Sequence, residues 1–75
     1  MKLSAAQAKA GRALLGWSLV ALSAKCKVGA TAIRLFEIGE RRPRRFEVLA
    51  IRRALEAAGV DFLTGKPGVK LRGRE

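Results

Sequence analysis

The chain has 75 residues, of which 16 are Lys or Arg and 6 are Asp or Glu, giving a formal net charge of +10. This length suits one small domain and excludes a multidomain enzyme. A hydrophobic content of 49% favours a packed core over disorder. With no histidine and one cysteine, zinc fingers, histidine metal sites and histidine acid–base catalysis are excluded. We therefore expect no enzyme, no metal and no cofactor, and the charge predicts a polyanionic partner.

The single cysteine, Cys26, cannot form an internal disulfide, and we interpret it as a small buried packing group. The most apolar stretch, Leu14 to Ala24, is broken by Gly16 and Ser18. It is too short for a membrane span and lacks the pattern of a signal peptide. The sequence therefore predicts a cytoplasmic protein that does not enter a membrane.

The first half of the chain contains signals for three helices. Ser4 and Gln7 fit a capping box that opens a helix running to about Leu15, and Gly16 ends it. Ser18 is expected to cap a second, short helix through about Cys26, with Leu22 on its inner side. After the break Lys27-Val28-Gly29, a third helix closed by Gly39 carries apolar residues at helical spacing, Ala32, Ile33 and Phe36.

The second half begins with a basic loop and ends with a predicted hairpin. Residues 40–45 carry four arginines around Pro43, which predicts an exposed loop. Phe46 to Ala58 has an apolar stripe at Val48, Ile51, Leu55 and Ala58, with Arg52, Arg53 and Glu56 expected to point away from it. Val60 to Leu63 and Val69 to Arg72, separated by Thr64 to Gly68, predict two strands of a β-hairpin.

Two short helices across a tight break, followed by a basic loop, are the ingredients of a helix-turn-helix. The pattern is carried by Trp17-Ser18 to Leu22, Val28-Gly29, Ile33, Phe36 to Glu40, and Arg42-Pro43-Arg44. On these residues, the stretch from Leu3 to Gly59 resembles the lambda-repressor/Cro-like (XRE-type) helix-turn-helix family of bacterial and phage transcription regulators. The end of the chain also resembles small bacterial members in which a strand pair replaces the last helix.

The resemblance implies a mostly α fold with two parts. Residues 1–59 would form a compact four-helix helix-turn-helix domain, and residues 60–75 a short C-terminal β-hairpin and basic tail. It also implies a DNA-binding transcription regulator that associates with the nucleoid in the cytoplasm. The open edges of the hairpin predict a homodimer, because such edges can pair across a two-fold axis.

The resemblance also assigns roles to individual residues. Arg12 would form a structural ion pair with Glu37, and a lone Glu in a basic protein needs such a cation. The base contacts would come from the third helix, at Ala30, Thr31, Arg34 and Leu35. The phosphate contacts would come from the start of the second helix and from the basic loop, at Ser18, Leu19, Arg41, Arg42, Arg44 and Arg45.

A second hypothesis comes from the second helix. Leu19, Val20, Ala21 and Ala24 make it apolar on a side expected to face solvent or DNA, and exposed apolar patches mark interaction surfaces. The alternative function is therefore a protein-interaction module on a helix-turn-helix scaffold, such as an antitoxin-like protein or a co-regulator. Double-stranded DNA remains the partner under the first hypothesis.

Overall fold

Six secondary-structure elements make up the described part of the computed structural model, residues 3–62 and 69–71. They are α1 (Ala5–Leu15), α2 (Leu19–Cys26), α3 (Ala30–Glu37), α4 (Arg45–Ala57), β1 (Val60–Phe62) and β2 (Val69–Leu71). The predicted fold class, mostly α with a C-terminal antiparallel hairpin, is confirmed. Leu63, the Thr64 to Gly68 turn and Arg72 lie outside the described residues.

The ends of α1 and α2 follow the predicted caps. The Gln7 N–H donates to Ser4 Oγ and the Ser4 N–H donates to Gln7 Oε1, both at 3.0 Å, which completes the capping box. Gly16 ends α1 in the left-handed region, at φ 68°, where glycine has no steric penalty. The Ala21 N–H donates to Ser18 Oγ at 3.0 Å and opens α2. Local sequence signals therefore determine where α1 begins and ends and where α2 begins.

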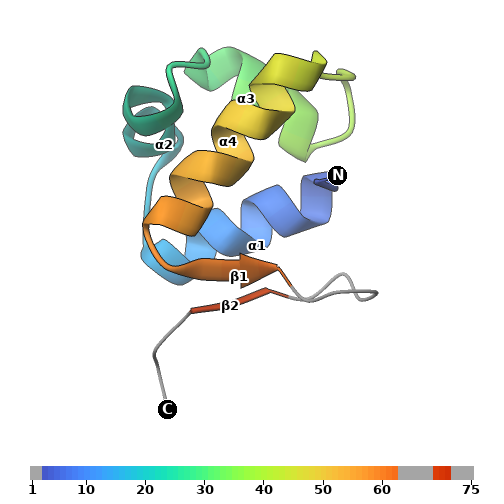
Figure 1. Ribbon diagram of the computed structural model, residues 1–75. Helices are drawn as coiled ribbons and strands as arrows, with labels where there is room; N and C mark the ends of the chain where they lie inside the picture. The colour runs from blue at the N-terminus through green and yellow to red at the C-terminus, as the bar shows by residue number, and fades with distance from the viewer. Residues whose placement is uncertain (1–2, 63–68, 72–75) are drawn as a thin grey trace.

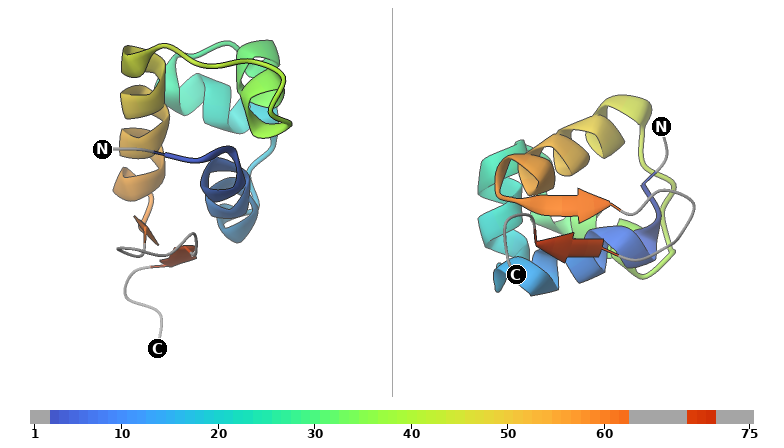
Figure 2. Two further views of the ribbon diagram at one scale, coloured as in Figure 1. Left: turned by 90° about the vertical axis from the view of Figure 1, so that its right-hand side faces the viewer. Right: turned by 60° about the horizontal axis from the view of Figure 1, so that its bottom comes forward.

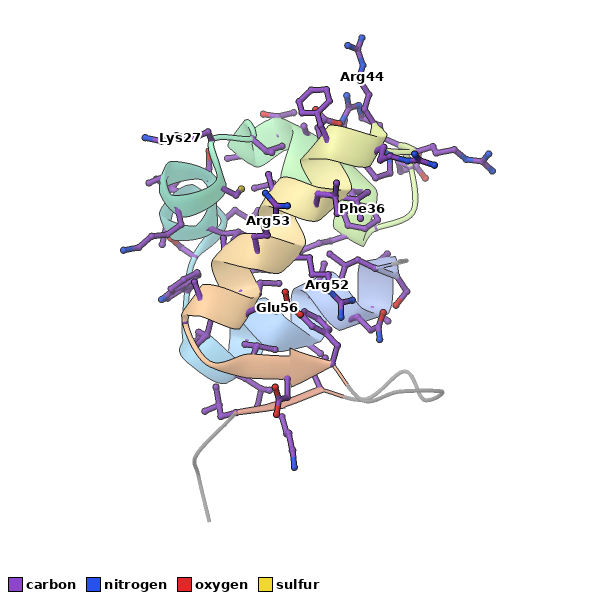
Figure 3. The ribbon with its side chains drawn as sticks, in the orientation of Figure 1. Lys27, Phe36, Arg44, Arg52, Arg53 and Glu56 are labelled. Carbon is purple, nitrogen blue, oxygen red and sulfur yellow. The ribbon has the colours of Figure 1, made fainter. Side chains whose placement is uncertain are left out.

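The break between α2 and α3 contains a left-handed residue that is not glycine. Lys27 has φ 63°, and its N–H donates to the Ser23 carbonyl oxygen at 2.8 Å. Its side chain is exposed and extends away from α2 (Figure 3). Val28 is buried beside it, and Gly29 is the N-cap of α3. The break therefore anchors one apolar side chain in the core while the chain turns.

The start of α4 corrects the predicted loop. The helix begins at Arg45, with Arg44 as its N-cap, so Arg45 belongs to the helix and not to the loop. The Glu47 side chain accepts a hydrogen bond from the Arg44 N–H at 3.0 Å, which satisfies an amide that the helix leaves unpaired. At the other end, Ala58 is exposed and was wrongly placed in the apolar stripe.

The core lies where α1, α3 and α4 meet α2 and the hairpin (Figure 1). Its fully buried large side chains come from four elements: Leu22, Ile33, Ile51, Leu55 and Val60. β1 and β2 pair in the register Val60↔Leu71, Asp61↔Lys70 and Phe62↔Val69. The strands lie across α1 and the end of α4 (Figure 2, right), while the α3–α4 loop lies at the opposite end of α4. The hairpin thus shares the core of the helices.

A glycine inside α1 lets these elements approach closely. A Cβ atom at Gly11 would lie 3.3 Å from Leu55 Cδ1 and 3.4 Å from Val60 Cγ1. Gly11 is buried, so the backbone of α1 packs directly against side chains of α4 and β1 at this point. Gly11 could not be identified as a contact point from the sequence, because a glycine within a helix does not indicate which distant residues pack against it.

Candidate nucleic-acid interface

The Arg12–Glu37 pair fastens α1 to the end of α3. Arg12 Nε donates to Glu37 Oε2 at 2.9 Å and Arg12 Nη2 donates to Glu37 Oε1 at 2.8 Å, a two-bond geometry. Arg12 Nη1 also donates to the Trp17 carbonyl oxygen at 2.9 Å. The hydrogen bond to Glu37 raises the pKa of Arg12. Both charged groups are occupied within the fold, so the pair orients α3 and leaves neither group for a ligand.

The four residues predicted for base contacts divide by exposure. Thr31 and Arg34 are exposed and lie three residues apart, on one face of α3. Ala30 and Leu35 are half-buried. The Arg34 side chain makes no hydrogen bond or ion pair with any residue in the described ranges. The polar groups of this helix that face solvent are therefore Thr31 and Arg34.

At the start of α2, the two predicted phosphate contacts differ. Ser18 is exposed, and its oxygen accepts the Ala21 N–H. A hydroxyl that accepts one bond keeps its own hydrogen for another acceptor. Leu19 is half-buried and packs on the core, which corrects the expectation that it belongs to an exposed apolar side. Ala21 is half-buried as well, whereas Val20 and Ala24 are exposed.

The basic loop and the first residue of α4 together carry four arginines, of which one is held by a glutamate and three are exposed. Arg41 Nη1 donates to Glu47 Oε1 at 3.1 Å, and the Arg41 side chain is only one-third exposed. Arg42, Arg44 and Arg45 are exposed, and their side chains have no ion-pair partner among residues 3–62 and 69–71. Arg44 extends away from the body of the protein (Figure 3). The loop and the start of α4 thus present three guanidinium groups to solvent.

Glu47 organises this loop, and the sequence analysis missed it. Its carboxylate accepts the Arg44 N–H and pairs with Arg41. The backbone N–H of Arg44, then the Arg41 guanidinium, lower the pKa of Glu47. Glutamate three residues after a helix N-cap is a local signal that could have revealed the first contact. The second contact depends on the path of the loop, which no local pattern specifies.

Arg52 does not point away from the core, contrary to expectation. Its Nε donates to Glu56 Oε2 at 3.1 Å, and its guanidinium lies 4.6 Å from the centre of the Phe62 ring. Figure 3 shows Arg52 and Glu56 together on the side of α4 that faces β1. The ion pair lies within α4, and the cation–π interaction with Phe62 is the contact that joins α4 to β1. Arg53, the next residue, is exposed.

The described residues hold no group that suits a metal centre or a reactive thiol. No group of three or more His, Cys, Asp or Glu side chains there lies close enough to hold a metal ion. Cys26 is buried, and this burial raises the pKa of its thiol. Among the helices of the described ranges, none has the length and apolar character to cross a membrane. Neither the models of known protein families nor the curated proteins contain a match to this chain.

Proposed function

We propose that this protein is a DNA-binding transcription regulator that inserts α3 into the major groove. The main supporting observation is that exposed Thr31 and Arg34 on α3 are followed by three exposed arginines, Arg42 and Arg44 before α4 and Arg45 at its start. None of the three has an ion-pair partner among the described residues. A helix with polar groups suits base edges, and guanidinium groups suit phosphates. The formal charge of +10 supports the same partner.

The available side chains favour non-specific affinity for DNA over discrimination between base sequences. Arg34 can bond guanine with two hydrogen bonds and Thr31 can bond a base edge, whereas Ala30 offers a thymine methyl contact. Leu35 offers no hydrogen bond. Ser18 and the three exposed arginines bind phosphates. The charge of Arg41 is partly neutralised by Glu47, so Arg41 contributes less to DNA binding. Arg44, which extends away from the body of the protein (Figure 3), also suits a narrow minor groove.

The assembly that we propose is a homodimer in the cytoplasm, associated with the nucleoid. Within residues 3–62 and 69–71, the sheet has two strands, so each strand has an edge without a strand partner. Such edges can pair across a two-fold axis. A monomeric mass by light scattering at tens of micromolar protein would contradict the dimer.

The experiment that tests the function is selection of bound sequences from a random DNA pool at near-physiological salt. Enrichment of a palindromic motif would support a specific regulator, and binding without enrichment would indicate a non-specific DNA-binding protein. A salt titration then measures how much of the binding affinity comes from electrostatic contacts with phosphates. Neutralising roughly five phosphates gives a slope of about −4.5 for log K against log salt. A binding curve that does not respond to salt contradicts the proposal.

A protein-interaction module remains the second candidate because of one observation on α2. Val20 is 71% exposed, and Ala24, four residues later on the same face, is exposed as well. An exposed valine on a small domain suits a protein partner better than a phosphate. Under this alternative, substitution of Val20 by Gln abolishes capture of the partner and leaves any DNA binding intact.

A further inference from the structure

An open hollow of about 1080 Å³ lies where α1 begins, α3 ends and α4 begins. The left view of Figure 2 looks onto this side, with the α3–α4 loop above α1. Its lining combines apolar and basic side chains, among them Leu3, Phe36, Val48, Leu49, Arg42 and Arg45. This volume belongs to a depression that is open to solvent, so it offers a surface for side chains of a partner and does not enclose a ligand.

An exposed aromatic residue extends this apolar surface. Phe46 is 63% exposed, and Leu49, three residues later, lines the hollow. Side chains three positions apart are neighbours on a helix surface. The Phe46 ring therefore lies beside Leu49 on the first turns of α4, next to the hollow but outside its lining. Aromatic and arginine side chains together are the residues enriched at protein interfaces.

The charge around the hollow is uncompensated. Arg42 and Arg45 are exposed, with no ion-pair partner in the described part of the chain. Of the two glutamates close to them in the sequence, Glu47 is occupied by Arg41 and by the Arg44 N–H. Glu40 forms no ion pair within the same described ranges. An occupant of the hollow must therefore bring acidic groups as well as an apolar side chain.

We propose that the hollow and Phe46 form a docking site for an acidic peptide segment. A leucine or aromatic side chain of the segment enters the hollow, and its carboxylates pair with Arg42 and Arg45. DNA complements only the basic part of this surface. Its phosphates pair with the arginines but make few favourable contacts with the apolar residues of the hollow or with Phe46. If the proposed DNA binding holds, the shared arginines make peptide and DNA mutually exclusive.

The test begins with selection of a random displayed peptide library on the full chain. We expect enrichment of sequences with Asp or Glu around a leucine or aromatic residue. One enriched peptide is then synthesised and titrated by fluorescence anisotropy. Phe46→Ser should weaken it at least about tenfold, as for an aromatic anchor. Leu14→Ser, at an exposed apolar residue near the other end of α1, is the control and should change the affinity less than about twofold.

Two further measurements separate this site from the DNA surface. Arg42→Ala with Arg45→Ala should weaken both the peptide and DNA, whereas Phe46→Ser should leave DNA affinity within about twofold. Circular dichroism checks that each variant folds. No acidic and apolar enrichment, or equal peptide affinity for wild type and Phe46→Ser, overturns the inference. A Phe46→Ser variant that loses affinity for DNA but keeps its affinity for the peptide also overturns it. Peptide binding without any DNA binding refutes the proposed function and leaves the docking site standing.

Discussion

Arg12 and Glu37 lie 25 residues apart in the sequence and are joined by two hydrogen bonds of 2.9 and 2.8 Å between guanidinium and carboxylate. The Glu37 side chain is only 4% exposed. A carboxylate this well covered depends on its cation, because water can no longer solvate it. The pair therefore couples the end of α3, and with it the Thr31 and Arg34 face, to α1.

Removal of one partner from this pair is expected to destabilise the fold. Arg12→Ala should lower the free energy of unfolding by roughly 3 kcal/mol, because it leaves the Glu37 charge buried and unpaired. Urea denaturation measures the change. Arg53→Ala removes an exposed arginine of α4 and should change stability by less than about 0.5 kcal/mol. Equal effects of the two substitutions would contradict the structural role of the pair.

Glu47 should make stability depend on acid pH. Since its pKa is lowered in the folded protein, its contribution is complete above the unfolded pKa of about 4.3 and is lost as pH falls below that value. Glu47→Gln keeps a side-chain oxygen for the Arg44 N–H but loses the charge. We expect the urea midpoints of wild type and variant to differ at pH 6 and to converge near pH 3. The control Glu40→Gln, at an exposed position, should leave the pH profile unchanged.

The exposed arginines of the loop should determine the salt dependence of DNA binding. Replacing Arg42 and Arg44 by Ala should reduce the slope of log K against log salt by about 2, one unit for each phosphate contact. Lys9→Ala with Lys70→Ala removes the same charge from exposed positions on α1 and β2 and should change the slope much less. Identical slopes for the two double variants would mean that only net charge matters.

Gly11 should tolerate little added volume. Gly11→Val is expected to destabilise by roughly 2 kcal/mol, because branched carbons would press on Leu55 and Val60. Gly11→Ala gains helix propensity and adds only the tight contact, so it should stay within about 1 kcal/mol of wild type. Thermal unfolding measures both. Ala6→Val, at an exposed position of α1, is the control; a loss as large as that of Gly11→Val would point to helix propensity alone.

The apolar residues at the start of α2 should respond differently. Val20→Gln changes a side chain that is mostly in water, and stability should stay within about 0.5 kcal/mol. Leu19→Gln places an amide where leucine packs on the core and should cost more than about 1 kcal/mol. Chemical denaturation separates the two. Equal losses would mean that Val20 is also covered in solution, for instance by a second copy.

Short-range signals in the sequence determined most of the secondary structure. The Ser4 and Gln7 capping box, the Ser18 cap and the glycine after α1 act within one helical turn, so the helix ends could be predicted. The apolar spacing of Ile33 and Phe36, and of Ile51 and Leu55, identified the buried faces. The Arg12–Glu37 pair was expected from a family resemblance together with the isolation of Glu37 in a basic sequence.

Only the tertiary structure decided which charges and apolar groups remain in solvent. Arg41, Arg42, Arg44 and Arg45 look equivalent in the sequence, yet the path of the loop brings Arg41 to Glu47 and leaves the others exposed. Arg52 is covered because the hairpin returns Phe62 to α4. These outcomes depend on contacts between distant segments, whose partners no local pattern specifies. The net charge therefore follows from composition, whereas the placement of the charge that can reach a ligand follows from the fold.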